Sequence, residues 1–214
     1  MIFEMPFLNT RGDSEEEKEE KEEKEEKEEK KRGGGDLIAR LLKTRTIIIT
    51  DEVNKKMAER VITQLLLLEA DNDEDIRVFI NSPGGDADAG FAMYDMLRFV
   101  KPKIKAICAG VVASAAVIIL FGAKKEDRYS LPSSRILIHQ PSTGIHGTAS
   151  DIQIEATEIL KCREKMNRMI SVETGQPIGK IETDTRRNFW MSAEEALQYG
   201  LVNKIISSSE DLKV

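Results

Sequence analysis

The chain has 214 residues, two cysteines, two histidines and a formal net charge of −6. This length suits one α/β domain with an appendage, and two isolated cysteines give no support to a disulfide framework or a metal site. Residues 15–32 alone carry a charge of −4, from eleven Glu, six Lys and one Arg, so the rest of the chain is nearly neutral and offers no basic face for nucleic acid.

The N-terminal segment differs in composition from the rest of the chain. Residues 15–31 form a repeated Glu-Glu-Lys tract without any apolar residue. Such a tract cannot bury a face and is expected to be disordered, although its Glu–Lys pairs four residues apart also favour a solvated helix. Three glycines then end the tract, and Asp36 can cap a short helix through Leu42. We therefore expect a flexible N-terminal segment over residues 1–35 and one domain over residues 36–214.

Strands and helices alternate along the remainder of the chain. Apolar, β-branched runs predict strands at residues 46–50, 75–80, 104–108, 135–139 and 201–206. Apolar residues at helical spacing predict helices at residues 52–69, 91–99, 114–122 and 150–174, and a capping box from Ser192 to Glu195 begins another helix. Residues 188–191 are predicted to be short and extended. This alternation predicts an α/β fold with a parallel sheet.

One uncharged run, residues 106–123, is long enough to be considered as a membrane span. Gly110 and Gly122 interrupt it, and it is rich in alanine, so a buried strand, a turn and a core helix explain it better. The first eight residues are too short and too acidic to be a secretory signal. We therefore expect a cytoplasmic protein without membrane or nucleic-acid partners.

Two glycine-containing turns are the strongest local features, at residues 81–86 (Asn-Ser-Pro-Gly-Gly-Asp) and 109–116 (Ala-Gly-Val-Val-Ala-Ser-Ala-Ala). Each follows a predicted strand and leads into a predicted helix. Such a turn leaves backbone N–H groups free at a helix N-terminus, where they can bind an anion or a developing oxyanion. Ser114 lies at the start of the second helix, where a hydroxyl can project from a tight turn. Any chemistry is therefore expected at these two turns.

A serine nucleophile also needs a base, a group that orients the base, and donors for the oxyanion. His139 ends a predicted strand, at the sheet edge where ligands bind in such folds. His146 lies in a polar, glycine-rich loop and is expected to be exposed. The residues alone allow two interpretations: a catalytic Ser114–His139 pair, or Ser114 as a helix cap and His139 as a core residue.

Many stretches in register resemble the proteolytic subunits of the Clp protease, the ClpP family, over roughly residues 36–206. These stretches are Ile80–Gly85, Tyr94–Asp95, Gly110–Ser114, Arg135–Pro141, Asp151–Ile152, Glu158–Leu160, Thr174–Gln176, Asp184–Thr185 and Glu194–Val202. The resemblance implies a ClpP/crotonase-like α/β fold of repeated ββα-type units with a protruding handle helix. It also implies that Ser114 is the nucleophile and His139 the base. The backbone N–H groups of Gly85 and Ala115 would form the oxyanion hole, and no cofactor or metal is implied.

The third catalytic position departs from the family pattern. The family has Asp-Thr-x-x-Asp-x-Phe, whose second Asp orients the histidine, whereas residues 184–190 read Asp-Thr-Arg-Arg-Asn-Phe-Trp and place Asn188 there. An amide oxygen can accept a hydrogen bond from imidazole, but it cannot supply the negative charge that stabilises imidazolium. In a serine protease the change from Asp to Asn lowers turnover about 10⁴-fold. A weakened or conditionally active site is therefore expected.

The resemblance also implies partners: stacked heptameric rings of this chain, unfolded polypeptide substrates, and an AAA+ unfoldase such as ClpX, ClpA or ClpC. The chain has no Gly-x-x-x-x-Gly-Lys-Ser/Thr motif and so supplies no ATPase itself. Docking of an ATPase loop is expected at Phe79, Phe99 and Tyr129, with Arg77 where the family usually has an aromatic residue. The Glu/Lys tract falls where the family has its axial loop, and we expect it to gate the pore or alter ATPase pairing.

Three functions follow from these observations. The first is a self-compartmentalised serine endopeptidase that acts through Ser114, His139 and an acyl-enzyme. The second is a weakly active or inactive paralogue that acts as a structural partner in mixed rings with an Asp-bearing ClpP subunit. Asn188, Arg77 and the Glu/Lys tract favour this function. The third is a crotonase-type acyl-CoA enzyme, whose fold and oxyanion hole are similar. The Ser–His pair and the lack of an obvious acid in the second turn count against this third function, and we favour the first.

Overall fold

The computed structural model describes residues 37–212, which divide into two compact units between Lys43 and Thr44. In the first unit, residues 37–43 are helical, as the sequence predicts. The proposed cap Asp36 and the Glu/Lys tract lie outside the described residues. Everything below concerns the second unit.

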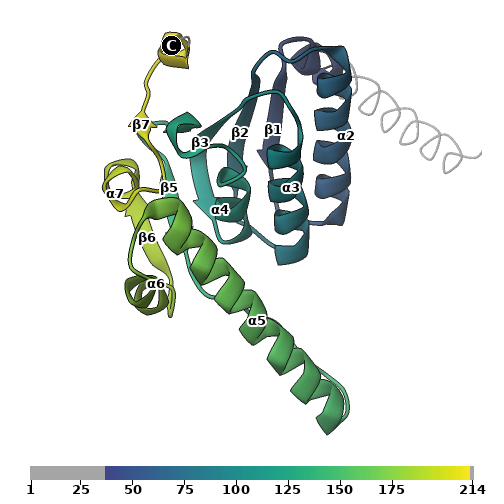
Figure 1. Cartoon of the computed structure of the whole chain (residues 1–214), viewed down its shortest axis with the longest axis vertical. Helices are drawn as coiled ribbons and strands as arrows, with labels where there is room; N and C mark the ends of the chain where they lie inside the picture. The colour runs from purple at the N-terminus through teal and green to yellow at the C-terminus, as the bar shows by residue number, and fades with distance from the viewer. Residues whose placement is uncertain (1–36, 213–214) are drawn as a thin grey trace, which may run out of the picture. The chain divides into compact units, whose positions relative to one another are not determined.

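The described strands form one seven-stranded sheet (Figure 1). They are β1 (Thr46–Thr50), β2 (Ile76–Ser82), β3 (Ile104–Ala113), β4 (Arg128–Ser130), β5 (Arg135–Ile138), β6 (Phe189–Ser192) and β7 (Lys204–Ile205). The order is β1-β2-β3-β4-β7, and β5 pairs with the second half of β3 and carries β6 at its other edge. All pairs are parallel except β5–β6, which is antiparallel. The predicted α/β fold with a mainly parallel sheet is confirmed.

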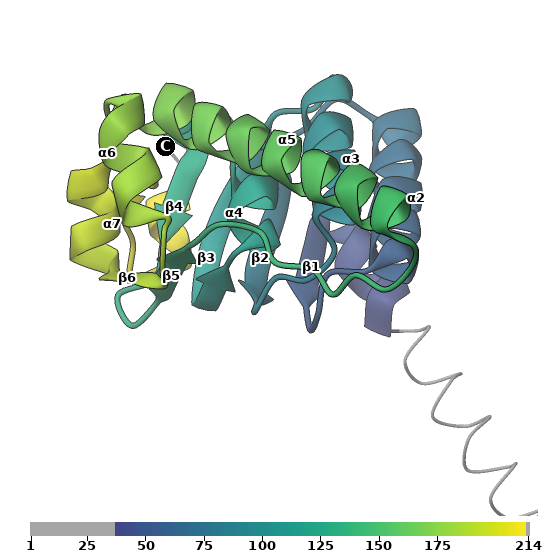
Figure 2. The same ribbon diagram turned by 90° about the horizontal axis from the view of Figure 1, so that it is seen from below.

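The helices connect these strands. They are α2 (Lys55–Asp71), α3 (Ala87–Phe99), α4 (Ala115–Leu120), α5 (Ala149–Thr174), α6 (Ile178–Asp184) and α7 (Ala193–Tyr199), with 3₁₀ turns η1 (Lys125–Asp127) and η2 (Ser209–Leu212). Helices α2, α3 and α4 lie side by side over the sheet (Figure 2). The long α5 extends away from the sheet (Figure 1), and its buried residues all belong to its C-terminal half, from Met166 to Thr174.

Several predicted boundaries are wrong in an informative way. Strand β3 runs to Ala113, five residues past the predicted end, so the second glycine turn is mostly strand and only Ser114 makes the bend. Helix α2 starts at Lys55 because Asn54 caps it, its side-chain oxygen accepting from the Met57 N–H. The final strand shrinks to two residues. Strand β4 and helix α6 have no predicted counterpart.

The uncharged run at residues 106–123 is a strand, a bend and a helix in the core, as the sequence predicts. Every residue of α4 is buried, although the helix has only six residues. Apolar side chains on both faces of β3 and all around α4 explain why the run resembles a membrane span in sequence. Within residues 37–212, no helix is long and apolar enough to cross a membrane.

Candidate active site

Ser114 occupies a strained bend between β3 and α4. Its backbone has φ 56° and ψ −120°, a region that a non-glycine residue rarely adopts. The Ser114 N–H donates to the Leu137 carbonyl at 3.0 Å, and its own carbonyl accepts from Val117 N–H at 3.0 Å. Hydrogen bonds on both sides therefore hold the bend. The half-buried side chain stands at the end of the strand, as in the sharp strand-to-helix turns that carry nucleophilic serines.

The first glycine turn lies directly against this bend. A Cβ on Gly84 would lie 2.5 Å from the Ala113 carbonyl oxygen and 2.7 Å from the Ser114 Cβ, so only glycine permits this approach. On its other side the turn bridges to Val53, whose N–H donates to the Gly84 carbonyl at 2.8 Å and whose carbonyl accepts from Asp86 N–H at 2.8 Å. The two glycine turns, far apart in sequence, thus meet at Ser114.

The Gly85 N–H takes no part in this bridge. The bridge uses the carbonyl of Gly84 and the N–H of Asp86 instead. Ala115 is the first residue of α4, so its N–H lies ahead of the helical hydrogen-bond ladder. Both donors sit in the two turns that meet at Ser114. The assignment of Gly85 and Ala115 as an oxyanion hole is compatible with this arrangement and stays a prediction.

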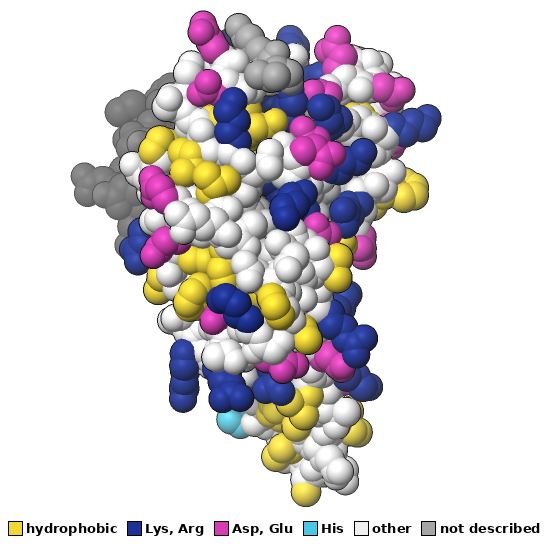
Figure 3. Space-filling view, turned by 60° about the vertical axis from the view of Figure 1, so that its left-hand side comes forward, with side chains coloured by type: hydrophobic (Ala, Val, Ile, Leu, Met, Phe, Trp, Pro, Cys, Tyr) yellow, Lys and Arg dark blue, Asp and Glu magenta, His cyan; other side chains and the backbone are white. Residues whose placement is uncertain are grey.

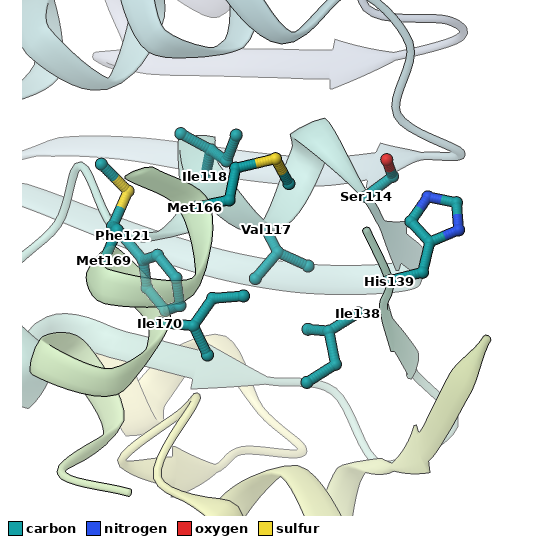
Figure 4. Close-up of a pocket in the computed structure, with 9 residues that line it drawn as sticks. All are labelled: Ser114, Val117, Ile118, Phe121, Ile138, His139, Met166, Met169 and Ile170. Carbon is teal, nitrogen blue, oxygen red and sulfur yellow. The ribbon is translucent and has the colours of Figure 1, made fainter. Parts of the chain in front are cut away.

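His139 follows β5 directly and lines the same pocket as Ser114, and the two side chains lie next to each other at one end of it (Figure 4). His139 is half-buried, so it is not a core residue. Its Nδ1 lies 3.0 Å from the Asn188 Oδ1. The sheet explains this contact: Ile138 pairs with Phe189 across the antiparallel β5–β6 ladder, so the residue after β5 faces the residue before β6.

Further hydrogen bonds lock the loop that carries Asn188 to the end of β5. Gln140 N–H donates to the Thr185 carbonyl at 2.7 Å, and Gln140 Nε2 donates to the Arg186 carbonyl at 2.9 Å. The Thr185 hydroxyl, in turn, donates to Asn167 Oδ1 of α5 at 3.0 Å. The orientation of His139 therefore depends on β5, the loop before β6 and α5 together.

An apolar pocket opens beside Ser114 and His139 (Figure 4). Its other lining residues are all hydrophobic: Val117, Ile118, Phe121, Ile138, Met166, Met169 and Ile170. They come from α4 and the residue that follows it, from β5 and from α5, so no local pattern reveals the pocket. The sequence does show Met166 and Met169 on one stripe of the long helix, but nothing in it says that this stripe faces the serine.

The remaining predicted site residues are His146 and the residues expected at the docking site. His146 is exposed in a loop without regular structure, as predicted. Phe79 and Tyr129 both pack against one small apolar cluster on the sheet. Phe99 is not in that cluster; it ends α3 and is 73% exposed. Arg77 lies on β2, as Phe79 does, and donates from Nη2 to the Thr44 carbonyl at 2.9 Å.

Comparisons with known proteins identify the family of this chain. A sequence profile of the Clp protease family matches residues 28–209. ATP-dependent Clp protease proteolytic subunit 3 of Rhizobium johnstonii is 48% identical over 179 residues, which is 84% of this chain and 92% of that protein. The protein of the same name from Rhizobium meliloti is also 48% identical, with the same coverage.

A solved structure is also similar. The asparagine-to-aspartate mutant of ClpP1 from Listeria monocytogenes superposes with a TM-score of 0.77 at 45% identity, covering 82% of this chain and 99% of that one. A profile match over most of the chain, relatives near half identity and a shared fold lead to one conclusion: this chain belongs to the Clp protease family and is a peptidase subunit of that family.

Proposed function

We propose that this chain is a serine endopeptidase that cleaves unfolded polypeptides with Ser114 as nucleophile, His139 as base and Asn188 as the group that orients the base. The observation that carries the proposal is the 3.0 Å contact between His139 Nδ1 and Asn188 Oδ1, made by a histidine that shares one pocket with the strained Ser114. When the Nδ1–H donates to the amide oxygen, Nε2 is left unprotonated and can accept the serine proton.

The proposed reaction proceeds through an acyl-enzyme. Ser114 Oγ attacks the scissile carbonyl carbon while His139 Nε2 takes the hydroxyl proton. The N–H groups of Gly85 and Ala115 stabilise the resulting oxyanion. As the C–N bond breaks, His139 returns the proton to the leaving amine, and a serine ester remains. Water then attacks this ester with His139 again as base, which releases the acid and regenerates Ser114.

Asn188 sets the strength of this site. Its amide oxygen can hold the correct imidazole tautomer, but it leaves the imidazolium of each transition state without a negative partner. In a serine protease the same exchange from Asp costs about 10⁴ in turnover. A second function follows from this observation: the chain is a weakly active paralogue whose main role is structural, in mixed rings with an Asp-bearing ClpP subunit.

The apolar pocket supports a preference for an apolar residue before the cleaved bond. It touches both Ser114 and His139 and is otherwise lined by aliphatic, aromatic and thioether side chains. An apolar substrate side chain packed against this lining would lose contact with water, whereas a charged side chain would lose hydration without a partner. Access to an enclosed chamber is then a second restraint on substrate choice rather than the sole one.

We infer the assembly from the family and from α5. Its exposed apolar residues Ile152, Ile154 and Leu160 lie on the half of the helix that projects from the sheet. Figure 3 shows apolar side chains gathered at this free end, at the bottom of the view. Such a face favours contact with a second subunit, in agreement with stacked heptameric rings.

Residues 36–214 would form the protease domain and residues 1–35 an axial segment that faces an AAA+ unfoldase such as ClpX, ClpA or ClpC. A cytoplasmic location also stays a prediction.

Hydrolysis of a small fluorogenic peptide with leucine before the cleaved bond tests the proposal. We expect slow cleavage by the native protein, none by Ser114→Ala or His139→Ala, and a gain of about 10²-fold or more in Asn188→Asp, because the carboxylate restores the charge beside His139. His146→Ala is the matched control and should cleave like the native protein. If Ser114→Ala keeps the native rate, Ser114 is not the nucleophile. If the native protein is silent and Asn188→Asp is active, the structural-partner function gains support.

A further inference from the structure

One row of side chains crosses four strands on one face of the sheet. The strand registers align Ile48, Phe79, Ile107 and Tyr129 from β1 to β4. Because side chains alternate between the two faces of a strand, this row lies opposite the side chains of Val78 and Ile80. Ile48 is 41% exposed at one end of the row, while Ile107 is fully buried.

The cover over Ile107 comes from the C-terminal part of the chain. Ile107, Ile206 and Leu212 form one buried cluster, against which Phe79, Tyr129 and Leu131 pack. Leu212 is the last residue of η2, the turn marked at the end of the chain in Figure 1, and it is 7% exposed. A leucine side chain of the chain itself therefore occupies the apolar surface that Phe79 and Tyr129 help to form.

Few contacts hold this turn in place. Lys105 Nζ donates to the Leu212 carbonyl at 2.8 Å and pairs with the Asp75 carboxylate at 3.0 Å. The Asp211 carboxylate accepts from the N–H groups of Ser207 and Ser208 at 3.0 Å each, which shapes the turn without fastening it to the sheet. Between Ile206 and Leu212, no residue is buried. The buried Leu212 side chain and the hydrogen bond from Lys105 thus connect residues 207–212 to the sheet.

We propose that residues 207–212 are a removable cover on the docking surface for an apolar loop of a partner ATPase. Leu212 fills, from within the chain, the place that an apolar side chain of the partner would take. The inference rests on the expectation, from the family resemblance, that an ATPase loop docks at Phe79 and Tyr129. Segments with few buried contacts open locally without unfolding the rest of a protein. The partner would therefore bind only the open fraction, and the measured dissociation constant would be the intrinsic one divided by that fraction.

The test compares binding of a purified ClpX hexamer, with a slowly hydrolysed ATP analogue, to four full-length or shortened proteins. They are the native chain, a chain that ends at Ser208, Leu212→Ser, and Ser209→Asp as the matched control. Ser209 is exposed and lies in the same turn, so its substitution leaves Leu212 seated. We expect the shortened chain and Leu212→Ser to bind ClpX at least threefold more tightly than the native chain, and Ser209→Asp to bind like it. A fifth protein, the shortened chain with Tyr129→Ala, should lose this gain.

Two results would overturn the inference. Equal binding by both the shortened chain and Leu212→Ser would show that Leu212 does not obstruct docking, and weaker binding by both would make Leu212 part of the docking surface. The second result is that ClpX binds none of the proteins, although each still cleaves the small fluorogenic peptide in an Asn188→Asp background. The docking proposal would then fail, and the peptidase proposal would stand. Loss of peptide cleavage on Ser114→Ala is scored separately, so the two proposals fail independently.

Discussion

At the scale of single residues, the site depends on a glycine that does no chemistry. Gly84 has φ 89° and lies so close to the Ser114 bend that its missing side chain sets the distance between the two glycine turns. Both turns carry proposed oxyanion donors. A displacement of about 1 Å in such a constellation can cost 10² in rate.

Gly84→Ala is therefore expected to reduce peptide cleavage at least about 10²-fold while the protein still folds. The added methyl group would meet the Ala113 carbonyl at 2.5 Å, and the positive φ adds strain. The measurement is cleavage of the fluorogenic peptide in the more active Asn188→Asp background, with circular dichroism to check folding. The matched control is Gly179→Ala in α6, where nothing lies within 4 Å of the added Cβ. If Gly84→Ala cleaves the peptide as fast as its Asn188→Asp parent, the two turns need not approach so closely.

At the scale of elements, α5 is anchored by a buried charge. Arg128 of β4 is fully buried; its guanidinium pairs with Glu173 near the end of α5, and its Nε donates to the Ala123 carbonyl at 2.9 Å. Glu173 also pairs with Arg98 of α3 at 2.9 Å. The Arg128 guanidinium stacks over the Phe121 ring, with its central carbon 4.9 Å from the ring centre. Since Phe121 lines the apolar pocket, the same cluster supports that wall.

Glu173→Ala is expected to lower the free energy of unfolding by about 3–5 kcal/mol, because it leaves the buried Arg128 without a charged partner. Urea denaturation measures this loss. The control is Glu164→Ala on the same helix, which removes an exposed pair with Arg168 and should change stability by less than about 1 kcal/mol. Equal effects of the two substitutions would mean that the Arg128 pair is no stronger than a surface pair.

At the scale of the whole molecule, the N-terminal tract is a separate question, since it lies outside the described residues. Residues 15–32 carry a charge of −4 in each subunit, and a ring would multiply it around one opening. Surface charge of one sign disfavours the approach of like-charged molecules, and salt screens the effect over about 10 Å at 0.1 M.

Deletion of residues 15–32 should speed the cleavage of an acidic fluorogenic peptide more than that of a neutral one, and the difference should shrink at high salt. A tract of equal length made of Gly and Ser separates charge from length: if charge acts, it behaves like the deletion. Unchanged cleavage of both peptides, together with unchanged ClpX binding, would exclude a gating or pairing role for the tract.

Local patterns were sufficient for the parts of this protein that depend on local physics. Apolar, β-branched runs predicted most strands, and helical spacing predicted most helices. The Ser192–Glu195 capping box began α7 as expected, and glycines after apolar runs marked the turns at the site. The resemblance to the Clp family then assigned roles to Ser114, His139 and Asn188, and the structure brings these three together. Their roles still await the kinetic test.

Pairing and packing between distant segments decided the rest. Strand β3 continues past Ala109 and Gly110, which have low strand propensity, because Val111, Val112 and Ala113 pair with β5. The apolar pocket exists because three elements from different parts of the chain converge beside Ser114. Leu212 covers Ile107 because the last turn folds back over the sheet. Sequence patterns show which face of a helix or strand is apolar, but only the tertiary structure determines which other element packs against that face.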